Sequence, residues 1–196
     1  MYAIVEDNNI TQYINNPKSV IIGDVRYPSK FFELWTTAEK EAIGIYEIVV
    51  DKTNYKDPEY YNNTNSSYTF ADGQVTESWG TATAKELEDR NATDEDGVEL
   101  NPIVVIEGLK TEKKKIVKAQ ASGLLAPTDW YVIKATEIAE YSVPENITTF
   151  RADVRSKSNE METQIDACNS VEELETLYTR DQNGVRPLAE FPEEVV

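Results

Sequence analysis

Hydrophobic and polar positions near the start of the chain alternate as they do in short strands. Residues 2–6 (YAIVE) and 10–14 (ITQYI) are apolar runs separated by residues 7–9 (DNN), which tolerate the backbone angles of a turn. We therefore expect an antiparallel hairpin over residues 2–14.

A second hairpin is predicted over residues 67–80. The runs SYTFA and QVTESWG flank Asp72-Gly73, a dipeptide typical of tight hairpin turns. The apolar run IYEIVV at residues 45–50 predicts one further strand. The first part of the chain should therefore form a small, mostly antiparallel sheet.

A short helix and an aromatic cluster interrupt these strands. Thr36 and Glu39 have the spacing of a capping box, which predicts a helix over residues 38–43. Gly44 is suited to end this helix in the left-handed conformation. Pro28 rules out a continuous strand before the helix. Four large apolar side chains should anchor a small core there: Phe31, Phe32, Leu34 and Trp35.

The apolar positions of the last third repeat at helical intervals. After Pro144, a residue suited to the start of a helix, six apolar residues fall near one face: Ile147, Phe150, Val154, Met161, Ile165 and Cys168. Ser170 and Glu173 have capping-box spacing and open a second helix after a break at Asn169. Such apolar stripes most often pack within the same chain, and Cys168 is interpreted as a small buried hydrophobe.

These patterns predict an α+β protein: a small, mostly antiparallel sheet with one short helix, followed by a helical region. Residues 85–99 carry seven acids and two bases, which is typical of a solvated linker or rim. Four parts are expected: a β-rich domain at residues 1–82, an acidic linker at 83–102, a helical domain at 103–180, and an irregular tail at 181–196 that is mobile unless a partner holds it.

Charge excludes several classes of function. The chain has 19 basic and 36 acidic residues, a formal net charge of −17, which disfavours binding to nucleic acid or to an anionic membrane. No stretch reaches the roughly 18 to 20 apolar residues needed to span a bilayer. The start, MYAIVEDNN, lacks the basic flank and apolar core of a signal peptide, and there is a single cysteine. The sequence therefore predicts a cytoplasmic protein.

Candidate chemistry is scarce. The chain has no histidine, which removes the usual general base and most zinc sites, and it has no Walker-type or G-x-G-x-x-G loop. Asp94, Asp96 and Glu99 do not fall at the positions of an EF-hand, so we assign no metal and no cofactor. No enzymatic activity is expected. A carboxylate-based hydrolase acting on cell-surface glycan is the enzyme alternative that stays open.

One basic segment interrupts the acidic chain. Residues 109–118 hold five lysines and one glutamate. These lysines either neutralise acidic groups of the same chain or dock an acidic partner, and the first interpretation is favoured. Either attraction should weaken as the salt concentration rises.

The stretch LLAPTDWYV at residues 124–132 carries a family resemblance. Together with the basic segment before it and VPENITTFRADVRS after it, the stretch resembles the carboxy-terminal region of bacteriophage tail assembly chaperones. The matching residues are Leu124, Leu125, Ala126, Thr128, Asp129, Trp130, Phe150, Arg151 and Arg155. The segment YPSKFFELWTTAEKEAIGIYEIV is similar to a module of phage tail and tail-fibre accessory proteins. The chain departs from the family at residues 131–133 (YVI), where many members have an acidic or proline-rich link.

This resemblance implies a non-enzymatic phage tail protein. It would bind a tail or tail-fibre component during virion assembly in the host cytoplasm. The residues implied in partner binding or in the family motif are Leu124, Leu125, Asp129, Trp130, Phe150, Arg151 and Arg155. The alternative is a structural subunit retained in the virion, such as a tail-fibre base or adaptor, and a homo-oligomer is compatible with both.

Trp130 has two interpretations. It is either a hot spot for a partner or a buried anchor for the helical region, with Thr128 or Asp129 capping a turn after Pro127. The buried anchor is favoured, and it predicts that Trp130→Ala lowers the free energy of unfolding by roughly 3 to 5 kcal/mol.

Overall fold

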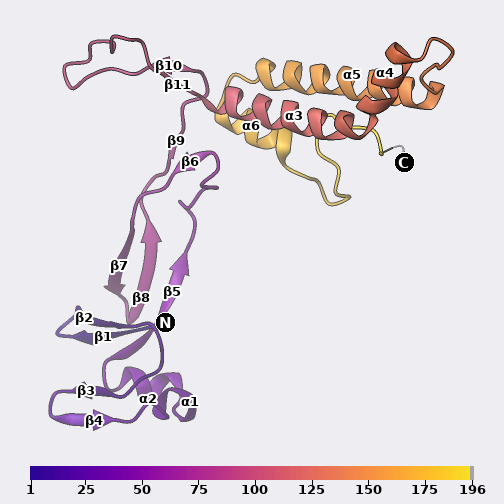
Figure 1. The fold of residues 1–196 in the computed structure, drawn as a ribbon. Helices are drawn as coiled ribbons and strands as arrows, with labels where there is room; N and C mark the ends of the chain where they lie inside the picture. The colour runs from indigo at the N-terminus through magenta and orange to yellow at the C-terminus, as the bar shows by residue number, and fades with distance from the viewer. Residues whose placement is uncertain (195–196) are drawn as a thin grey trace. The chain divides into compact units, whose positions relative to one another are not determined.

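The structure is a computed structural model that describes residues 1–194 of the chain. It is an α+β protein, as the sequence predicts, with a curled, mostly antiparallel sheet followed by a helical region (Figure 1). The chain divides into two compact units, Met1–Thr83 and a second unit from Ala84 onward. Each unit is described separately below.

The first unit is built on a five-stranded sheet with the order β2-β1-β5-β8-β7. Neighbouring strands are antiparallel except β5 and β8, which run parallel, so the predicted mostly antiparallel sheet is confirmed. The strands are β1 (Tyr2–Glu6), β2 (Asn9–Ile14), β5 (Ile45–Asp51), β7 (Ser66–Ala71) and β8 (Gln74–Trp79).

Both predicted hairpins are present, and their turns explain why. Asp7 and Asn8 have φ angles of 50° and 62°, and Asp72 and Gly73 have φ angles of 52° and 76°. Positive φ at both central residues matches the right-handed twist of the flanking strands, and Asn, Asp and Gly adopt it at the lowest cost.

Two short helices lie between β4 (Val25–Tyr27) and β5, where the sequence predicted one. The predicted capping box is confirmed in α2 (Thr37–Glu41), because the Thr36 hydroxyl accepts from the Glu39 amide while the Glu39 carboxylate accepts from the Thr36 amide. The additional helix is α1 (Phe31–Leu34). Gly44 has a φ of 82°, and a Cβ there would lie 2.6 Å from the carbonyl oxygen of Val5, so glycine is required.

Buried side chains line both faces of the sheet. One cluster contains Ile4, Ile14, Val20, Phe31, Phe32 and Ile45, and the other contains Ala3, Val5, Ile48 and Val75. The predicted aromatic anchor is therefore largely present, with Trp35 packed against the first cluster. Leu34 is the exception, because its position in α1 leaves it 76% exposed.

Four further short strands were not predicted from the sequence, and the last of them, β9 (Thr83–Ala84), spans the boundary between the two units. β3 (Val20–Ile22) and β4 (Val25–Tyr27) form a hairpin, and β6 (Tyr61–Asn62) pairs with β9. Strands of two or three residues are too short to show an alternating pattern.

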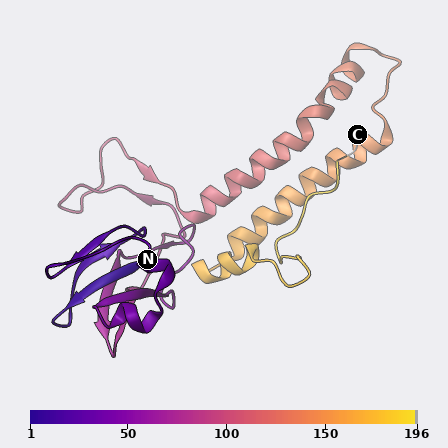
Figure 2. The same ribbon diagram turned by 90° about the horizontal axis from the view of Figure 1, so that it is seen from below.

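The second unit is dominated by two long helices, α3 (Leu109–Leu125) and α5 (Glu145–Ala167), which lie side by side in both views (Figures 1 and 2). A 3₁₀ turn, η1 (Ala126–Thr128), and α4 (Asp129–Glu137) connect them, and α6 (Val171–Tyr178) follows. The six apolar residues predicted to share a face are all buried, Cys168 among them. Within the described residues, no helix has the length and apolar character that crossing a bilayer requires.

The chain after α6 folds back along α5. The Leu188 amide donates to the Leu177 carbonyl at 3.0 Å, and the Leu188 side chain is 1% exposed. The Gln164 side chain donates to the Pro187 carbonyl at 3.3 Å and accepts from the Ala189 amide at 2.8 Å. As expected, residues 181–194 form no helix or strand, and the chain itself holds residues 187–189 of this tail.

Residues 90–106, which we call the arm, form a two-stranded hairpin before α3. β10 (Arg90–Asn91) pairs with β11 (Val105–Ile106), and an isolated bridge joins Thr93 to Glu99 nearer the tip. The Asp94 carboxylate accepts hydrogen bonds from the amides of Asp96 and Val98 and so shapes the tip. Part of the segment predicted as an acidic linker therefore has regular structure.

Candidate partner-binding site

Arg151 joins three elements of the second unit at one corner. Its Nη1 atom on α5 donates to the carbonyl oxygen of Leu125 at 3.1 Å and to the Thr128 hydroxyl at 2.5 Å. The same atom lies 2.8 Å from the Asp129 carboxylate at the start of α4. Arg151 is 8% exposed, so one buried cation fixes the junction between α3, η1 and α4.

The predicted capping role of Thr128 and Asp129 is wrong. The Thr128 side chain makes no cap hydrogen bond at the start of α4; its hydroxyl donates to the Leu125 carbonyl instead. Asp129 is the ion-pair partner of Arg151. The long Arg151 side chain reaches these groups because α5 lies against the end of α3.

An apolar layer lies next to this polar corner. Phe150, Val154 and Ala121 are buried together, and Leu124 and Leu125 pack against them while partly exposed. The remaining resemblance residue, Arg155, donates to the carbonyl oxygen of Arg151 at 3.3 Å. Five of the seven candidate residues therefore gather around the corner formed by α3, η1 and α5, and Arg155 lies one turn further along α5.

Trp130 does not belong to that corner, and the favoured interpretation of it as a buried anchor is wrong. Its side chain is 50% exposed, and α4 has no buried residue. Trp130 is not among the side chains that form the apolar layer or pack against it. Its ring centroid lies 3.9 Å from that of Tyr131, its neighbour in sequence.

The exposed side of α4 combines apolar, aromatic and cationic groups. Ile133 is 56% exposed and shares a helix face with Trp130, since residues three apart are neighbours on a helix. The Lys134 Nζ atom lies 5.6 Å from the Trp130 ring centroid and 4.2 Å from that of Tyr141. We call Trp130, Ile133 and Lys134 the α4 surface. Tryptophan is more common at interfaces than on the rest of a protein surface, whereas lysine is less common there.

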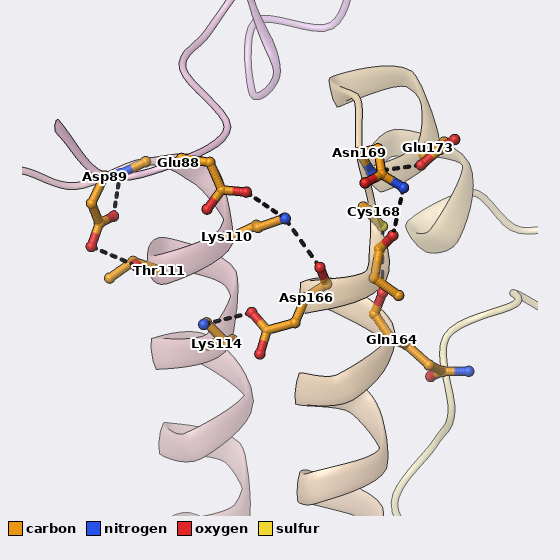
Figure 3. Close-up of polar contacts among 12 residues, drawn as sticks. Glu88, Asp89, Lys110, Thr111, Lys114, Gln164, Asp166, Cys168, Asn169 and Glu173 are labelled. Atoms are coloured by element: carbon orange, nitrogen blue, oxygen red, sulfur yellow. Dashed lines mark hydrogen bonds and ion pairs between the residues drawn. The ribbon is translucent and has the colours of Figure 1, made fainter.

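A second polar cluster ties the segment before the arm to the opposite end of the helix pair (Figure 3). The Asp89 carboxylate accepts from the Gly108 amide at 2.8 Å and from the Thr111 hydroxyl at 3.0 Å, and these hydrogen bonds lower the pKa of Asp89. Lys114 on α3 donates to the Asp166 carboxylate on α5 at 2.7 Å, which raises the pKa of Lys114. These contacts join the segment before the arm to the start of α3, and α3 to the end of α5.

The five lysines of α3 all contact groups of their own chain. This arrangement agrees with the favoured interpretation, internal neutralisation, and removes the main motive for an acidic partner at this helix. Four lysines form ion pairs and one lies over an aromatic ring: Lys110 with Glu88, Lys114 with Asp166, Lys115 with Glu107, Lys118 with Glu162, and Lys113 over Tyr178.

An acidic groove of about 460 Å³ lies between α5 and the end of the described chain. It is lined by Glu145, Asp153 and Glu193 around the apolar surface of Phe150 and Pro192. All three carboxylates belong to exposed residues. A carboxylate-based hydrolase needs one acid enclosed in an apolar pocket, whereas these three residues are exposed.

The sequence singles out Trp130, but it does not indicate that Ile133 and Lys134 lie beside it or that Lys134 also contacts Tyr141. Ile133 belongs to residues 131–133, where the chain departs from the family, and Tyr141 lies in the loop after α4. Comparisons with protein-family models, with curated proteins and with solved structures find no match to this chain.

Proposed function

We propose that the chain is a non-enzymatic bacteriophage tail protein that binds a tail or tail-fibre component during virion assembly in the host cytoplasm. The α4 surface carries this proposal. Trp130 and Ile133 are 50% and 56% exposed on a helix that buries none of its own residues. Tryptophan is enriched in the energetic centres of interfaces, and a protein that exposes it on an otherwise unpacked helix gains solubility by covering it.

The corner around Arg151 has a positioning role in this proposal. Arg151 and Phe150 hold the end of α3 against α5, and they thereby set the direction in which α4 leaves the helix pair. The α4 surface then makes the contacts with the tail component. The resemblance residues divide accordingly into one contact residue, Trp130, and a group that places it.

Co-purification from phage-infected cells tests the proposal. The tagged full chain is expressed during infection, and the proteins that co-purify are identified by mass spectrometry. Trp130→Ala removes the centre of the α4 surface, while Ile116→Ala is a matched control because Ile116 is 46% exposed on α3. We expect a tail or tail-fibre protein with the wild type and with Ile116→Ala, and its loss with Trp130→Ala. Recovery of no tail or fibre protein by the wild type contradicts the proposal.

The alternative is a structural subunit that stays in the virion as a tail-fibre base, adaptor or accessory protein. The exposed aliphatic side chains of the arm favour it, because Ile103 and Val105 are 63% and 54% exposed and a permanent assembly would cover them. Mass spectrometry of purified particles separates the two roles. A stoichiometric amount of the chain indicates a structural subunit, whereas its absence from particles indicates a transient chaperone.

A further inference from the structure

The arm carries the longest uncharged apolar run on the exposed surface of the second unit. Residues 100–106 (LNPIVVI) contain no charged residue, and the four consecutive residues Ile103, Val104, Val105 and Ile106 are 63%, 49%, 54% and 40% exposed. Both views show the arm leaving the base of α3 as a thin ribbon, apart from the helix pair (Figures 1 and 2). Exposed aliphatic side chains on both faces of a ribbon are unusual in a monomer.

β11 is an edge strand within the described residues. It pairs on one side with β10, through Asn91 with Val105 and Arg90 with Ile106, in a sheet of only two strands. Its other edge presents unpaired amide and carbonyl groups. Natural proteins usually protect such an edge with lysine, proline or a covering segment, and an isolated two-stranded hairpin is at best marginally stable.

From these observations we propose that β11 pairs antiparallel with β11 of a second copy of this chain, joining two arms into a four-stranded sheet across a two-fold axis. An axis through Val104 places Val104 opposite Val104 of the second copy and Ile103 opposite its Val105. Each of these side chains then lies on the same face as an opposing β-branched aliphatic side chain, which is a favourable cross-strand pair.

Charge favours a second copy over a basic partner at this strand. The run itself is uncharged, and Glu107 directly after it is neutralised by its ion pair with Lys115. The acids of the arm lie at its tip, in residues 94–99, outside the strand that pairs. Two copies of this strand therefore do not repel each other where they pair. At long range, the net charge of −17 opposes the approach of two copies.

The repulsion between two negatively charged copies determines how their self-association depends on salt. Because salt screens the repulsion between two acidic chains and leaves the apolar contact intact, self-association should strengthen as the salt concentration rises. Binding of a basic partner would weaken under the same change. The proposal concerns the arm and does not depend on the α4 surface or on the nature of the tail component.

Sedimentation velocity of the purified full chain tests the proposal, at protein concentrations up to about 500 µM because an interface of this size is weak. We expect a monomer–dimer equilibrium that is stronger in about 0.5 M than in about 0.05 M NaCl. Val105→Lys should abolish the dimer, while Ile116→Lys should preserve it, since Ile116 is a comparably exposed aliphatic residue on α3. Circular dichroism checks that both variants keep the wild-type fold.

Hydrogen exchange gives a second readout that does not depend on a variant. Amides of residues 103–106 should become protected as the protein concentration rises, while those of α4 should not change. A monomer at every concentration and salt level overturns the proposal. A dimer that Val105→Lys leaves intact also overturns it, as does protection of the arm only when a tail protein is added.

Discussion

The guanidinium of Arg151 on α5 lies 2.8 Å from the carboxylate of Asp129, the first residue of α4. The same nitrogen also donates to the Leu125 carbonyl and to the Thr128 hydroxyl. The end of α3, the 3₁₀ turn and the start of α4 are thus held by one side chain. Trp130, the next residue, is 50% exposed and is not part of the apolar layer.

Arg151→Met should lower the free energy of unfolding by about 1 to 3 kcal/mol. The change removes the charged donor from the Leu125 carbonyl and the Thr128 hydroxyl, and hydrogen bonds to charged groups contribute about this much. The ion pair with Asp129 adds little, because the Asp129 side chain is 55% exposed. Urea unfolding followed by circular dichroism measures the difference.

Arg155→Met is the matched control for that measurement. Arg155 makes one hydrogen bond, at 3.3 Å, to the Arg151 carbonyl and is exposed, so its loss should cost less than about 0.5 kcal/mol. Equal destabilisation by the two variants would show that Arg151 has no special role at the corner.

Trp130→Ala should change stability little, in contrast to Phe150→Ala. Trp130 loses only its contacts with Tyr131 and Lys134, which at an exposed site amount to less than about 1 kcal/mol. Phe150 is 4% exposed, and its truncation leaves a cavity that should cost about 3 to 5 kcal/mol. Thermal unfolding of both variants tests the contrast. Similar losses of stability in the two variants would indicate that Trp130 is a buried anchor.

The hydrogen bonds to Asp89 make part of the stability depend on pH. The Gly108 amide and then the Thr111 hydroxyl lower the pKa of Asp89 in the folded chain. A lowered pKa contributes stability that is present above the unfolded value of about 3.9 and is lost as the pH falls through the folded value. The difference in thermal midpoint between wild type and Asp89→Asn should therefore shrink from about pH 6 to about pH 2.

Thr111→Val provides the internal comparison for this titration. It removes the hydrogen bond from Thr111 and leaves the one from the Gly108 amide in place. At neutral pH it should therefore lower the thermal midpoint less than Asp89→Asn does, and this difference from wild type should also shrink as the pH falls. A difference between wild type and Asp89→Asn that stays constant with pH would mean that these hydrogen bonds do not favour the ionised carboxyl.

Cys168 should react slowly with thiol reagents in the folded protein. Burial, followed by the negative charge of Glu173, raises the pKa of its thiol, so less of the reactive thiolate is present. At about pH 8 the rate should be at least tenfold lower than in the denatured chain. Cys168→Ser combined with Ile116→Cys supplies an exposed thiol for comparison. Equal rates for Cys168 and the exposed thiol would show that the pocket of Cys168 is open.

The fold was predictable wherever local chemistry decides it. The turns at Asp7-Asn8 and Asp72-Gly73 need positive φ angles, and Asp, Asn and Gly are the residue types that adopt such angles most readily. The buried face of α5 follows from its apolar spacing. The hairpin of β3 and β4 was missed because each strand has three residues, although Gly23-Asp24 lies at its turn.

The candidate site was less predictable, because it depends on contacts between segments far apart in the sequence. Hydrophobicity alone favours burial of Trp130, yet the packing of Phe150 against Ala121 completes the apolar layer before α4 begins. No local pattern indicates that Arg151 reaches Asp129. The resemblance treats these residues as one motif, and the geometry separates the residues that hold the corner from Trp130, which is exposed.

The affinity of the purified chain for the tail or tail-fibre protein recovered from infected cells tests the central claim most directly. Isothermal titration calorimetry compares wild type, Trp130→Ala and Ile116→Ala under the same conditions. Because truncation of a tryptophan hot spot costs at least about 2 kcal/mol, Trp130→Ala should weaken binding by at least about thirtyfold, and Ile116→Ala should bind like the wild type. Equal affinities for all three proteins would contradict a partner-binding role for the α4 surface.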